Sequence, residues 1–413
     1  MSERKLVHIE KIVNLQPISG YDRVEYATVL GWKVVVRKGE FQVGDYCCYF
    51  EIDSKLPEAE WSEFLRPKHF KVKTQKMCKV ISQGLALPLD TFAEKRTIIE
   101  PGVNGEPEEK VISLLPDWAK NAKEGDDVTD ILGVKYSVAA DNVRKAKKID
   151  PNAKYDRMAA RHPNIFKKPF IRKMMKHEWG KRILFLIFGK AKDNPKVFPT
   201  HFPYVHKTDE ERVENIPWVL ENKEPWCVTS KLDGTSSTYI LERTNRKKYE
   251  YYVLSRNVRQ LSSDQETYHE RNVYWDMEYK YHIRDFLQAQ LDINPKLTYV
   301  CLQGETVGVG VQGNPHKLKD TQFFAFNYID SEHGRYDSVE GKRLCEPFGI
   351  QWVPIIDTEY ILPDTMEEMK EHAEGNCDIP GGSGLREGFV YRSLDGQRSF
   401  KNVSRKYLLK HNE

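Results

Sequence analysis

The sequence predicts an α+β protein with a β-rich amino-terminal part and a larger part in which strands alternate with helices. Its 413 residues are enough for two or three domains with sizeable cores. Up to about residue 90, short runs of β-branched and aromatic side chains are separated by turn residues, which is typical of a small sandwich or barrel. From Cys227 onward, similar runs alternate with helical patterns, which indicates an antiparallel core.

The composition excludes a wholly disordered chain, because 18 Phe, 21 Tyr and 8 Trp side chains can bury a large apolar surface. The longest purely apolar run, residues 183–188, has six residues, whereas a membrane-spanning helix needs about 20. The first five residues form no apolar stretch, so no secretory signal is visible. We therefore expect a globular protein without a membrane partner.

The seven cysteines form no Cys-x-x-Cys pair and are odd in number, which argues against a disulfide framework and against a zinc ribbon. We expect an intracellular protein in a reducing compartment, either the cytoplasm or the nucleus. The 12 histidines show no metal-binding spacing and are expected to be structural or exposed.

The net charge of +3 conceals a strong asymmetry. Residues 141–200 contain 17 Lys and Arg against 5 Asp and Glu, a local charge of +12. Such a stretch is typical of a segment that binds a polyanion, and a solvated basic linker explains it equally well.

In the amino-terminal part, turn signals at Gly20, Gly31, residues 38–44 and Pro57 separate the predicted strands. Their spacing fits a five-stranded OB-type barrel. The expected strands are Val24–Leu30, Trp32–Arg37, Tyr46–Ile52 and Phe70–Ile81.

The last of these strands carries four lysines that could follow the phosphate backbone of RNA. A solvent-facing strand edge protected by lysines is an equally strong explanation. The four residues are Lys71, Lys73, Lys76 and Lys79.

Residues 94–130 are acidic and rich in Pro and Gly, which predicts a surface connection. The basic stretch that follows contains a helix-compatible run, Phe170–Phe188, between prolines. We therefore divide the chain into an OB-like domain with its acidic connection at 1–135, a basic linker or insertion at 136–195, and a catalytic domain at 196–413.

The carboxyl-terminal half is predicted to be an α+β domain. Its expected strands are Val253–Ser255, Thr298–Glu305, Gln322–Ile329 and Gly388–Arg392, and its expected helices are Val273–Leu291 and Pro363–Glu374.

The sharpest local motif is KLDGT, which begins at Lys231 and lies between two β-like runs. A lysine at a strand end can point its amine into a cleft, and Gly234 would let the backbone approach a phosphate closely. By itself the motif is weak, because a Lys-x-Asp-Gly match arises by chance in about one chain in twenty of this length. A plain surface turn explains it equally well.

Companion residues downstream strengthen the interpretation, because each lies on or beside a predicted strand and suits the binding of a nucleoside triphosphate. An arginine and a lysine offer cations for phosphate, and two carboxylates suit a ribose or a hard metal ion. Two phenylalanines on one strand face could stack on a purine, although core packing is the default for such a pair. The companions are Arg256, Glu305, Phe324, Phe326, Glu387 and Lys401.

In order and character these motifs resemble those of the covalent nucleotidyltransferases, and the sequence is similar to the ATP-dependent RNA ligases. The similarity favours the subgroup with an OB domain ahead of the adenylyltransferase domain. It extends to Lys207–Arg212 and to LQGE, EGFVYR and SFKNVSRKYLLK. Only 12 residues follow Lys401, which leaves no room for the OB domain that DNA ligases and capping enzymes place there.

The resemblance implies that Lys231 attacks ATP, forms lysyl-AMP and releases pyrophosphate. AMP would then pass to an RNA 5′-phosphate, and a 3′-hydroxyl would displace it to seal the strand. A free lysine has a pKa of about 10.4, so Lys231 needs positive neighbours, which Lys401 and bound Mg²⁺ or Mn²⁺ would supply.

The resemblance also implies roles for the companions. Glu305 would hold the ribose or a metal-bound water, and Glu387 would help to place the metal ion. Arg256 and Lys401 would neutralise charge on the α-phosphate during in-line attack. The other expected ATP contacts are Lys207, Asp233, Gly234, Phe324 and Phe326.

Two alternatives remain open. A capping nucleotidyltransferase would transfer GMP through the same lysine, and Ser230 stands where the family often has an acidic residue, so the choice between ATP and GTP is not decided. A noncatalytic RNA-binding protein would use only the OB-like part and the basic stretch, but the intact catalytic set argues against it. We expect a monomeric RNA ligase whose partner is RNA with 5′-phosphate and 3′-hydroxyl ends.

Overall fold

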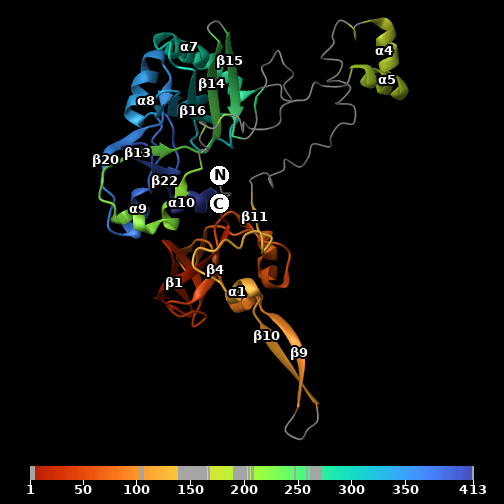
Figure 1. Ribbon diagram of the computed structural model, residues 1–413, viewed down its shortest axis with the longest axis vertical. Coiled ribbons are helices and arrows are strands. Elements are labelled where there is room, and N and C mark those ends of the chain that lie inside the picture. Colours follow the sequence, from red (N-terminus) through yellow and green to blue (C-terminus); the bar gives the residue numbers. More distant parts are fainter. Residues whose placement is uncertain are drawn as a thin grey trace. The chain divides into compact units, whose positions relative to one another are not determined.

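The chain folds into two units, each assembled from separate stretches of sequence (Figure 1). The first unit comprises residues 1–138, 209–232 and 354–413, and the second comprises residues 139–208 and 233–353. The residues described in this computed structural model are 5–101, 107–137, 165, 168–188, 202, 205, 209–245, 248–256, 259–260 and 272–411.

The amino-terminal part of the first unit is a curled antiparallel sheet. Its strands, in spatial order, are β3 (Trp32–Arg37), β2 (Tyr21–Val29), β1 (Val7–Ile18), β4 (Tyr46–Phe50) and β8 (Leu85–Pro88). Three of the four expected strands are therefore confirmed. The central strand β1 was missed, because polar residues such as His8 and Glu10 interrupt its apolar pattern although both are buried.

The expected strand Phe70–Ile81 is wrong. The chain reverses there in a hairpin of β6 (Gln75–Met77) and β7 (Val80–Ser82). The turn residues Cys78 and Lys79 have φ values of 49° and 67°, in the left-handed region that ends a strand. The lysine-rich run therefore extends over a turn and not along one strand. Strand β8, in place of the expected strand, completes the sheet.

Residues 94–101 and 107–114 form a β-ribbon where the sequence predicted an irregular connection. Strand β9 (Glu94–Pro101) pairs with β10 (Pro107–Leu114) along its whole length, and Figure 1 shows the ribbon extending from the amino-terminal sheet. Other short elements here are β5 (Ser54–Lys55), η1 (Glu60–Lys68), η2 (Leu89–Phe92), α1 (Asp117–Lys120) and β11 (Lys135–Tyr136).

A second five-stranded sheet completes the first unit. In spatial order its strands are β12 (Glu211–Arg212), β22 (Ser399–Val403), β21 (Gly388–Ser393), β13 (Trp226–Lys231) and β20 (Ile355–Tyr360). The strand expected at Gly388–Arg392 is confirmed as β21. The accompanying helices are η4 (Val213–Asn215), η5 (Pro217–Glu221), α9 (Met366–His372) and α10 (Arg405–His411).

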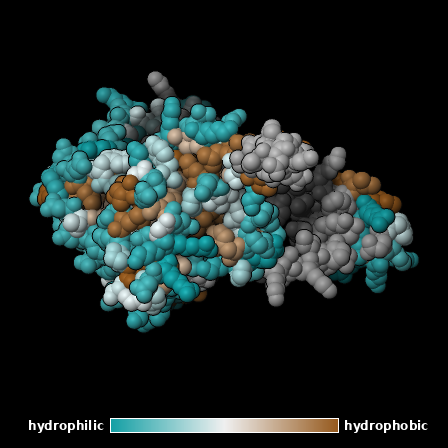
Figure 2. All heavy atoms as spheres, turned by 90° about the horizontal axis from the view of Figure 1, so that it is seen from below, coloured by the Kyte–Doolittle hydropathy of each residue, from teal (hydrophilic) through white to brown (hydrophobic). Residues whose placement is uncertain are grey.

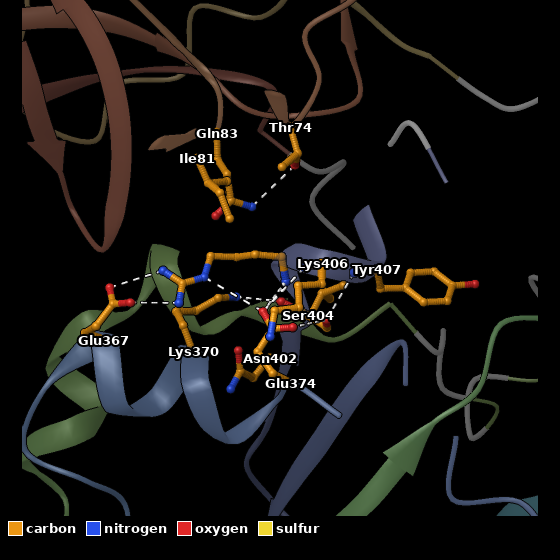
Figure 3. Close-up of polar contacts among 12 residues, drawn as sticks. Thr74, Ile81, Gln83, Glu367, Lys370, Glu374, Asn402, Ser404, Lys406 and Tyr407 are labelled. Carbon is orange, nitrogen blue, oxygen red and sulfur yellow. Dashed lines mark hydrogen bonds and ion pairs between the residues drawn. The ribbon is translucent and has the colours of Figure 1, made fainter. Parts of the chain in front are cut away.

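The two sheets of the first unit share a core and a polar network. Val403 and Leu408 belong to the same buried cluster as Trp32. Beside them, Glu374 accepts hydrogen bonds from Ser404 Oγ at 2.8 Å and from the Arg405 backbone N–H at 3.0 Å (Figure 3). The amino-terminal sheet therefore packs directly on the carboxyl-terminal end of the chain.

The second unit contains a larger antiparallel sheet with helices. In spatial order its strands are β15 (Lys248–Ser255), β14 (Thr235–Asn245), β16 (Tyr299–Gly308), β17 (Thr321–Asp330) and β18 (Gly334–Arg335), and β19 (Gln351–Trp352) also pairs with β17. The helices are α6 (Val273–Tyr281), α7 (Ile283–Ile293), α8 (Ser338–Cys345) and η6 (Glu346–Phe348). The expected helix Val273–Leu291 is two helices, because His282 has a φ of 50°.

The described part of the basic stretch forms two short helices, α4 (Pro169–Met175) and α5 (Glu178–Phe188), in place of one continuous helix. Trp179 and Leu186 are exposed on α5, and Figure 2 shows hydrophobic atoms on this helix pair at the right of the view. Within the described residues, no helix is long and apolar enough to cross a membrane. All seven cysteines are free thiols in this structure.

The buried His8 predicts how stability depends on pH. Burial alone would lower its pKa, but hydrogen bonds and charges from Glu10 and Glu51 raise it to about 9. A histidine with a raised folded-state pKa stabilises the fold fully below its unfolded pKa of about 6.5, and this stabilisation disappears as the pH rises through 9.

We expect the stability advantage of the wild type over His8→Gln to shrink between pH 6.5 and 9, by up to about 3 kcal/mol. Thermal unfolding of both proteins across this pH range measures the difference. Parallel stability curves would show that His8 does not hold this proton.

Candidate active site

Strand pairing in the first unit brings three cations to one face of a sheet. Arg212 of β12 is in register with Lys401 of β22, and Lys401 is in register with Val390 of β21. Val390 pairs in turn with Thr229, two residues before Lys231 on β13. Because side chains alternate along a strand, Arg212, Lys401 and Lys231 lie on the same face.

Lys231 forms an ion pair with Glu387, whose Oε1 accepts from the lysine Nζ. Glu387 directly precedes β21 and is 8% exposed. Its second oxygen, Oε2, is buried and makes no hydrogen bond within the described part of the chain. A buried carboxylate oxygen without a partner is costly, so this atom fits the coordination of a hard divalent cation.

Lys401 is buried and has a depressed pKa. Burial is the main cause, followed by the positive charge of Arg212, and together they lower the pKa of Lys401 to about 8. An ion pair with Asp209, at 2.8 Å between Nζ and Oδ1, acts in the opposite direction. Lys401 therefore changes its charge close to physiological pH.

Arg212 is a residue that the sequence interpretation included in a motif without assigning it to the site. It is 6% exposed, and its Nε and Nη1 atoms make no hydrogen bond among the described residues. A buried guanidinium with two nitrogen atoms that lack a hydrogen bond among the described residues suits a phosphate. Only the parallel pairing of β12 with β22 shows that Arg212 belongs to the site, although the motif Lys207–Arg212 was part of the resemblance to the RNA ligases. Lys207 itself lies outside the described residues.

Two glycines in the motifs allow strands to approach closely. A Cβ at Gly388 would collide with the Asn402 carbonyl oxygen of β22, and a Cβ at Gly234 would collide with the Thr306 carbonyl oxygen of β16. Close packing against β16 therefore explains why residue 234 is a glycine, whether or not a phosphate binds there.

In the second unit, a buried histidine holds the turn that follows Lys231 and Leu232. The Asp233 N–H donates to His316 Nε2 at 3.1 Å, and His316 is 1% exposed. Because the sequence interpretation treated all histidines alike, it did not anticipate this contact, whose partners are 83 residues apart.

Glu305 lies on β16 beside a hydroxyl cluster. It is in register with Ser236, and Thr235 Oγ1 lies 2.8 Å from Tyr274 OH. Burial raises the pKa of Tyr274, and the negative charge of Glu305 raises it further. Arg256, at the end of β15, is exposed.

The two phenylalanines occupy different environments. Phe324 is 2% exposed and belongs to the core, whereas Phe326 is only partly buried. Gln303 pairs with Asn327 and Gly304 with Ala325, so Phe326 is the extra residue of a β-bulge. The bulge interrupts the simple alternation on which the shared-face prediction depended.

Ser230 is connected to a carboxylate from a distant loop. Its Oγ donates to Asp378 Oδ2 at 2.7 Å, and Arg386 binds both oxygens of Asp378. The position before Lys231 therefore has an acidic neighbour even though residue 230 is not acidic.

The four lysines of the amino-terminal part do not share one strand. Lys76 and Lys79 are exposed on the β6–β7 hairpin, whereas Lys71 and Lys73 are partly buried ahead of it.

For a metal ion, no group of three or more His, Cys, Asp or Glu side chains that could hold it occurs among the described residues. The buried Oε2 atom of Glu387 makes that residue the best-supported single ligand.

Comparisons with known proteins identify the kinds of domain that the chain contains. A family model for an OB-fold domain matches residues 6–89, and the RNA ligase family model matches residues 224–408. Among solved structures, an RNA ligase of Naegleria gruberi with pyrophosphate is similar at 27% identity over 99% of both chains, with a TM-score of 0.69. No curated protein matches the chain.

Variants of the Naegleria gruberi ligase are similar to the same degree. One with AMP and manganese shares 28% identity over 99% of both chains, and one with ATP and manganese shares 27% over 99% of this chain and 100% of that one, each with a TM-score of 0.69. The OB-fold sheet and the matched catalytic domain define a polynucleotide ligase. Residues 224–408 match the RNA ligase family, and the residues that match an OB-fold domain precede them in the chain.

The close approach at Gly234 gives a test of this local geometry. Gly234→Ala should destabilise the protein by more than the roughly 1 kcal/mol that is typical of a glycine in an unfavourable backbone conformation, because its Cβ meets backbone atoms of β16. Gly310→Ala is the control, since Gly310 has a φ of +83° and open space around it. Thermal unfolding would contradict this explanation if the two variants lose equal stability.

Proposed function

We propose that this RNA ligase is ATP-dependent and works through a covalent lysyl-AMP at Lys231. The observation that carries the proposal is the placement of Lys231, Glu387 and Lys401 on adjoining strands of a domain that matches the RNA ligase family. The Naegleria gruberi ligase with ATP and manganese supports the choice of ATP over GTP.

In the first step, the uncharged Lys231 amine attacks the α-phosphorus of ATP. A P–N bond forms, the bond between the α-phosphorus and the bridging oxygen breaks, and pyrophosphate leaves. The ammonium form cannot attack, so Lys231 must first lose its proton, against the attraction of Glu387 and with the repulsion of Lys401. Lys401 and Arg212 also stabilise the negative charge that develops on the phosphates.

In the second step, an oxygen of the RNA 5′-phosphate attacks the same phosphorus and releases the Lys231 amine. The product is RNA that carries AMP through a 5′–5′ pyrophosphate. In the third step, an RNA 3′-hydroxyl attacks the RNA phosphorus, a phosphodiester forms, and AMP leaves. Neither of these steps needs a second nucleotide.

A divalent cation, Mg²⁺ or Mn²⁺, would be held by Glu387 through its unsatisfied Oε2. When bound, it would withdraw electron density from phosphate oxygens and lower their negative charge.

We assign the remaining sequence-predicted residues to ATP as proposals. Glu305 would contact the ribose or a metal-bound water, and its position beside Thr235 and Tyr274 supports a role in a polar environment. Phe326 is better exposed than Phe324 for stacking on a purine. The further proposed contacts are Lys207, Asp233, Gly234 and Arg256.

The proposed partner is RNA with a 5′-phosphate and a 3′-hydroxyl, bound by a monomer. Lys71, Lys73, Lys76 and Lys79 would contact the RNA backbone, and the exposure of the last two supports this role. The seven free thiols support a reducing compartment, the cytoplasm or the nucleus. The division at 1–135, 136–195 and 196–413 also stays a proposal.

The first prediction concerns the nucleophile. Lys231→Ala should fold and acquire no label from α-labelled ATP and a divalent cation, because Lys231 supplies the amine that contacts Glu387 in the described part of the chain. The exposed Lys248→Ala should label as the wild type does. Label on Lys231→Ala would assign the adduct to another lysine.

The second prediction concerns pH. The pKa of Lys401 is lowered to about 8, so free enzyme loses this cation as the pH rises through 8, and kcat/KM for adenylyl transfer should fall there. Lys401→Arg keeps its charge, so its kcat/KM relative to the wild type should rise between pH 7 and 9.5. A constant ratio would show that the charge at position 401 does not matter.

The third prediction concerns RNA. Neutralising Lys76 and Lys79 should weaken RNA binding and reduce its log–log salt slope by roughly 0.7 per lost phosphate contact on single strands. Lysyl-AMP formation should be unaffected, since it needs no RNA. An unchanged salt slope with normal sealing would show that these lysines only protect an exposed hairpin.

A further inference from the structure

Side chains of the OB-fold domain contact the residue that faces Lys401. The Arg212 Nη2 atom lies 3.5 Å from Asp53 Oδ2, and the guanidinium centre lies 5.8 Å from the Trp32 ring. Trp32 begins β3, and Asp53 lies between β4 and β5. A cation of the ligase sheet is therefore held by an anion and an aromatic ring from the other sheet of the same unit.

Hydrogen bonds fix the chain just after Arg212. Trp32 Nε1 donates to Asn215 Oδ1 at 2.6 Å, and Asn215 Nδ2 donates to Glu51 Oε1 at 2.5 Å. Trp32 and Glu51 are 0% and 1% exposed, so water does not compete for these bonds. The short helix η4, which ends at Asn215, is thus bound to the OB-fold sheet.

The backbones also meet directly. The Gly31 N–H donates to the Glu214 carbonyl oxygen at 2.8 Å, and a Cβ at Gly31 would lie 2.9 Å from Glu214 Cα. On its other side, Glu214 forms a buried ion pair with Lys370 at 2.6 Å, and Lys370 donates to the Val403 carbonyl oxygen at 2.7 Å. Residues 211–215 are therefore fixed between the OB-fold sheet and β22.

From these contacts we propose that Trp32, Glu51 and Asp53 are positioning residues for adenylyl transfer, which hold residues 211–215 so that Arg212 faces Lys401. The inference rests on the proposed function. It gives the OB-fold domain a task in the reaction with ATP, before RNA binds, in addition to the RNA contacts proposed for its lysines.

Asp53 is the most informative residue for a test. Its φ of 73° lies in the left-handed region, which asparagine adopts readily, so Asp53→Asn removes the charge with little change of shape. The charge of Arg212 also contributes to the lowered pKa of Lys401. A changed environment of Arg212 should therefore shift the basic limb of the pH profile of kcat/KM for AMP transfer. A general loss of stability would not shift it.

The experiment measures AMP transfer to Lys231 by the full-length protein with α-labelled ATP and Mg²⁺, in the absence of RNA. Asp53→Asn should lower kcat/KM by about tenfold, mainly through KM for ATP, below the roughly 100-fold that a 1 Å displacement can cost. Its basic limb should move to lower pH, because the less compensated Arg212 repels the Lys401 ammonium more strongly.

Two further variants accompany it. Trp32→Phe keeps a ring near Arg212 but removes the donor to Asn215, so a smaller loss of the same kind is expected. Lys33→Gln is the matched control, because Lys33 joins the same strand to Glu367 of α9 at 2.9 Å in a half-exposed ion pair, away from Arg212. It should leave AMP transfer unchanged.

Wild-type kinetics and pH profiles in both Asp53→Asn and Trp32→Phe would overturn the inference, even if RNA sealing is impaired. A loss of AMP transfer as large in Lys33→Gln would also overturn it, because general docking of the domain would then be responsible. If Asp53→Asn does not fold, Trp32→Phe alone decides. A wild-type protein that takes up no AMP would instead refute the proposed function, and the two failures are thus distinct.

Discussion

The antiparallel pairing of β13, β21 and β22 is the constraint on which the site depends. Lys231, Glu387 and Lys401 are separated by up to 170 positions in the sequence, and only this register brings them together. Gly388 is essential to it, since any larger residue would collide with β22. The short strand β12 then extends the same face with Arg212.

The site concentrates charge where water has little access. Arg212, Glu387 and Lys401 are each less than a tenth exposed, yet neither Arg212 nor Glu387 has all its polar atoms paired within the described residues. Buried groups of this kind destabilise a protein unless a ligand completes their interactions. The phosphate oxygens and the cation that we propose as ligands would complete these interactions.

The sequence predicted much of the fold because most strands and helices have a characteristic local residue pattern. Strands such as β2, β3 and β21 have clear alternating or apolar patterns. Two of the failures occurred where a backbone angle overrides a pattern. The left-handed Cys78 and Lys79 split an expected strand, and His282 split an expected helix. A bulge at Phe326 disturbed the predicted face of β17 in the same way.

For the site, the motifs identified candidate residues, but they did not show which residues from distant parts of the chain contact one another. Arg212 becomes visible only through β12, and His316 only through its contact with Asp233. The link between Trp32 and Asn215 spans 183 positions, and no local signal points to it. Contacts of this type depend on tertiary structure, which a single sequence does not display.

The shared core of the first unit has a consequence for protein synthesis. Trp32 and its neighbours pack against Val403 and Leu408, which belong to the last fifteen residues of the chain. The ribosome therefore releases the OB-fold sheet long before the side chains that cover part of it exist. During that interval the growing chain presents an apolar surface, and a prematurely terminated polypeptide would keep it permanently uncovered, which makes truncated products natural targets for chaperones and proteases.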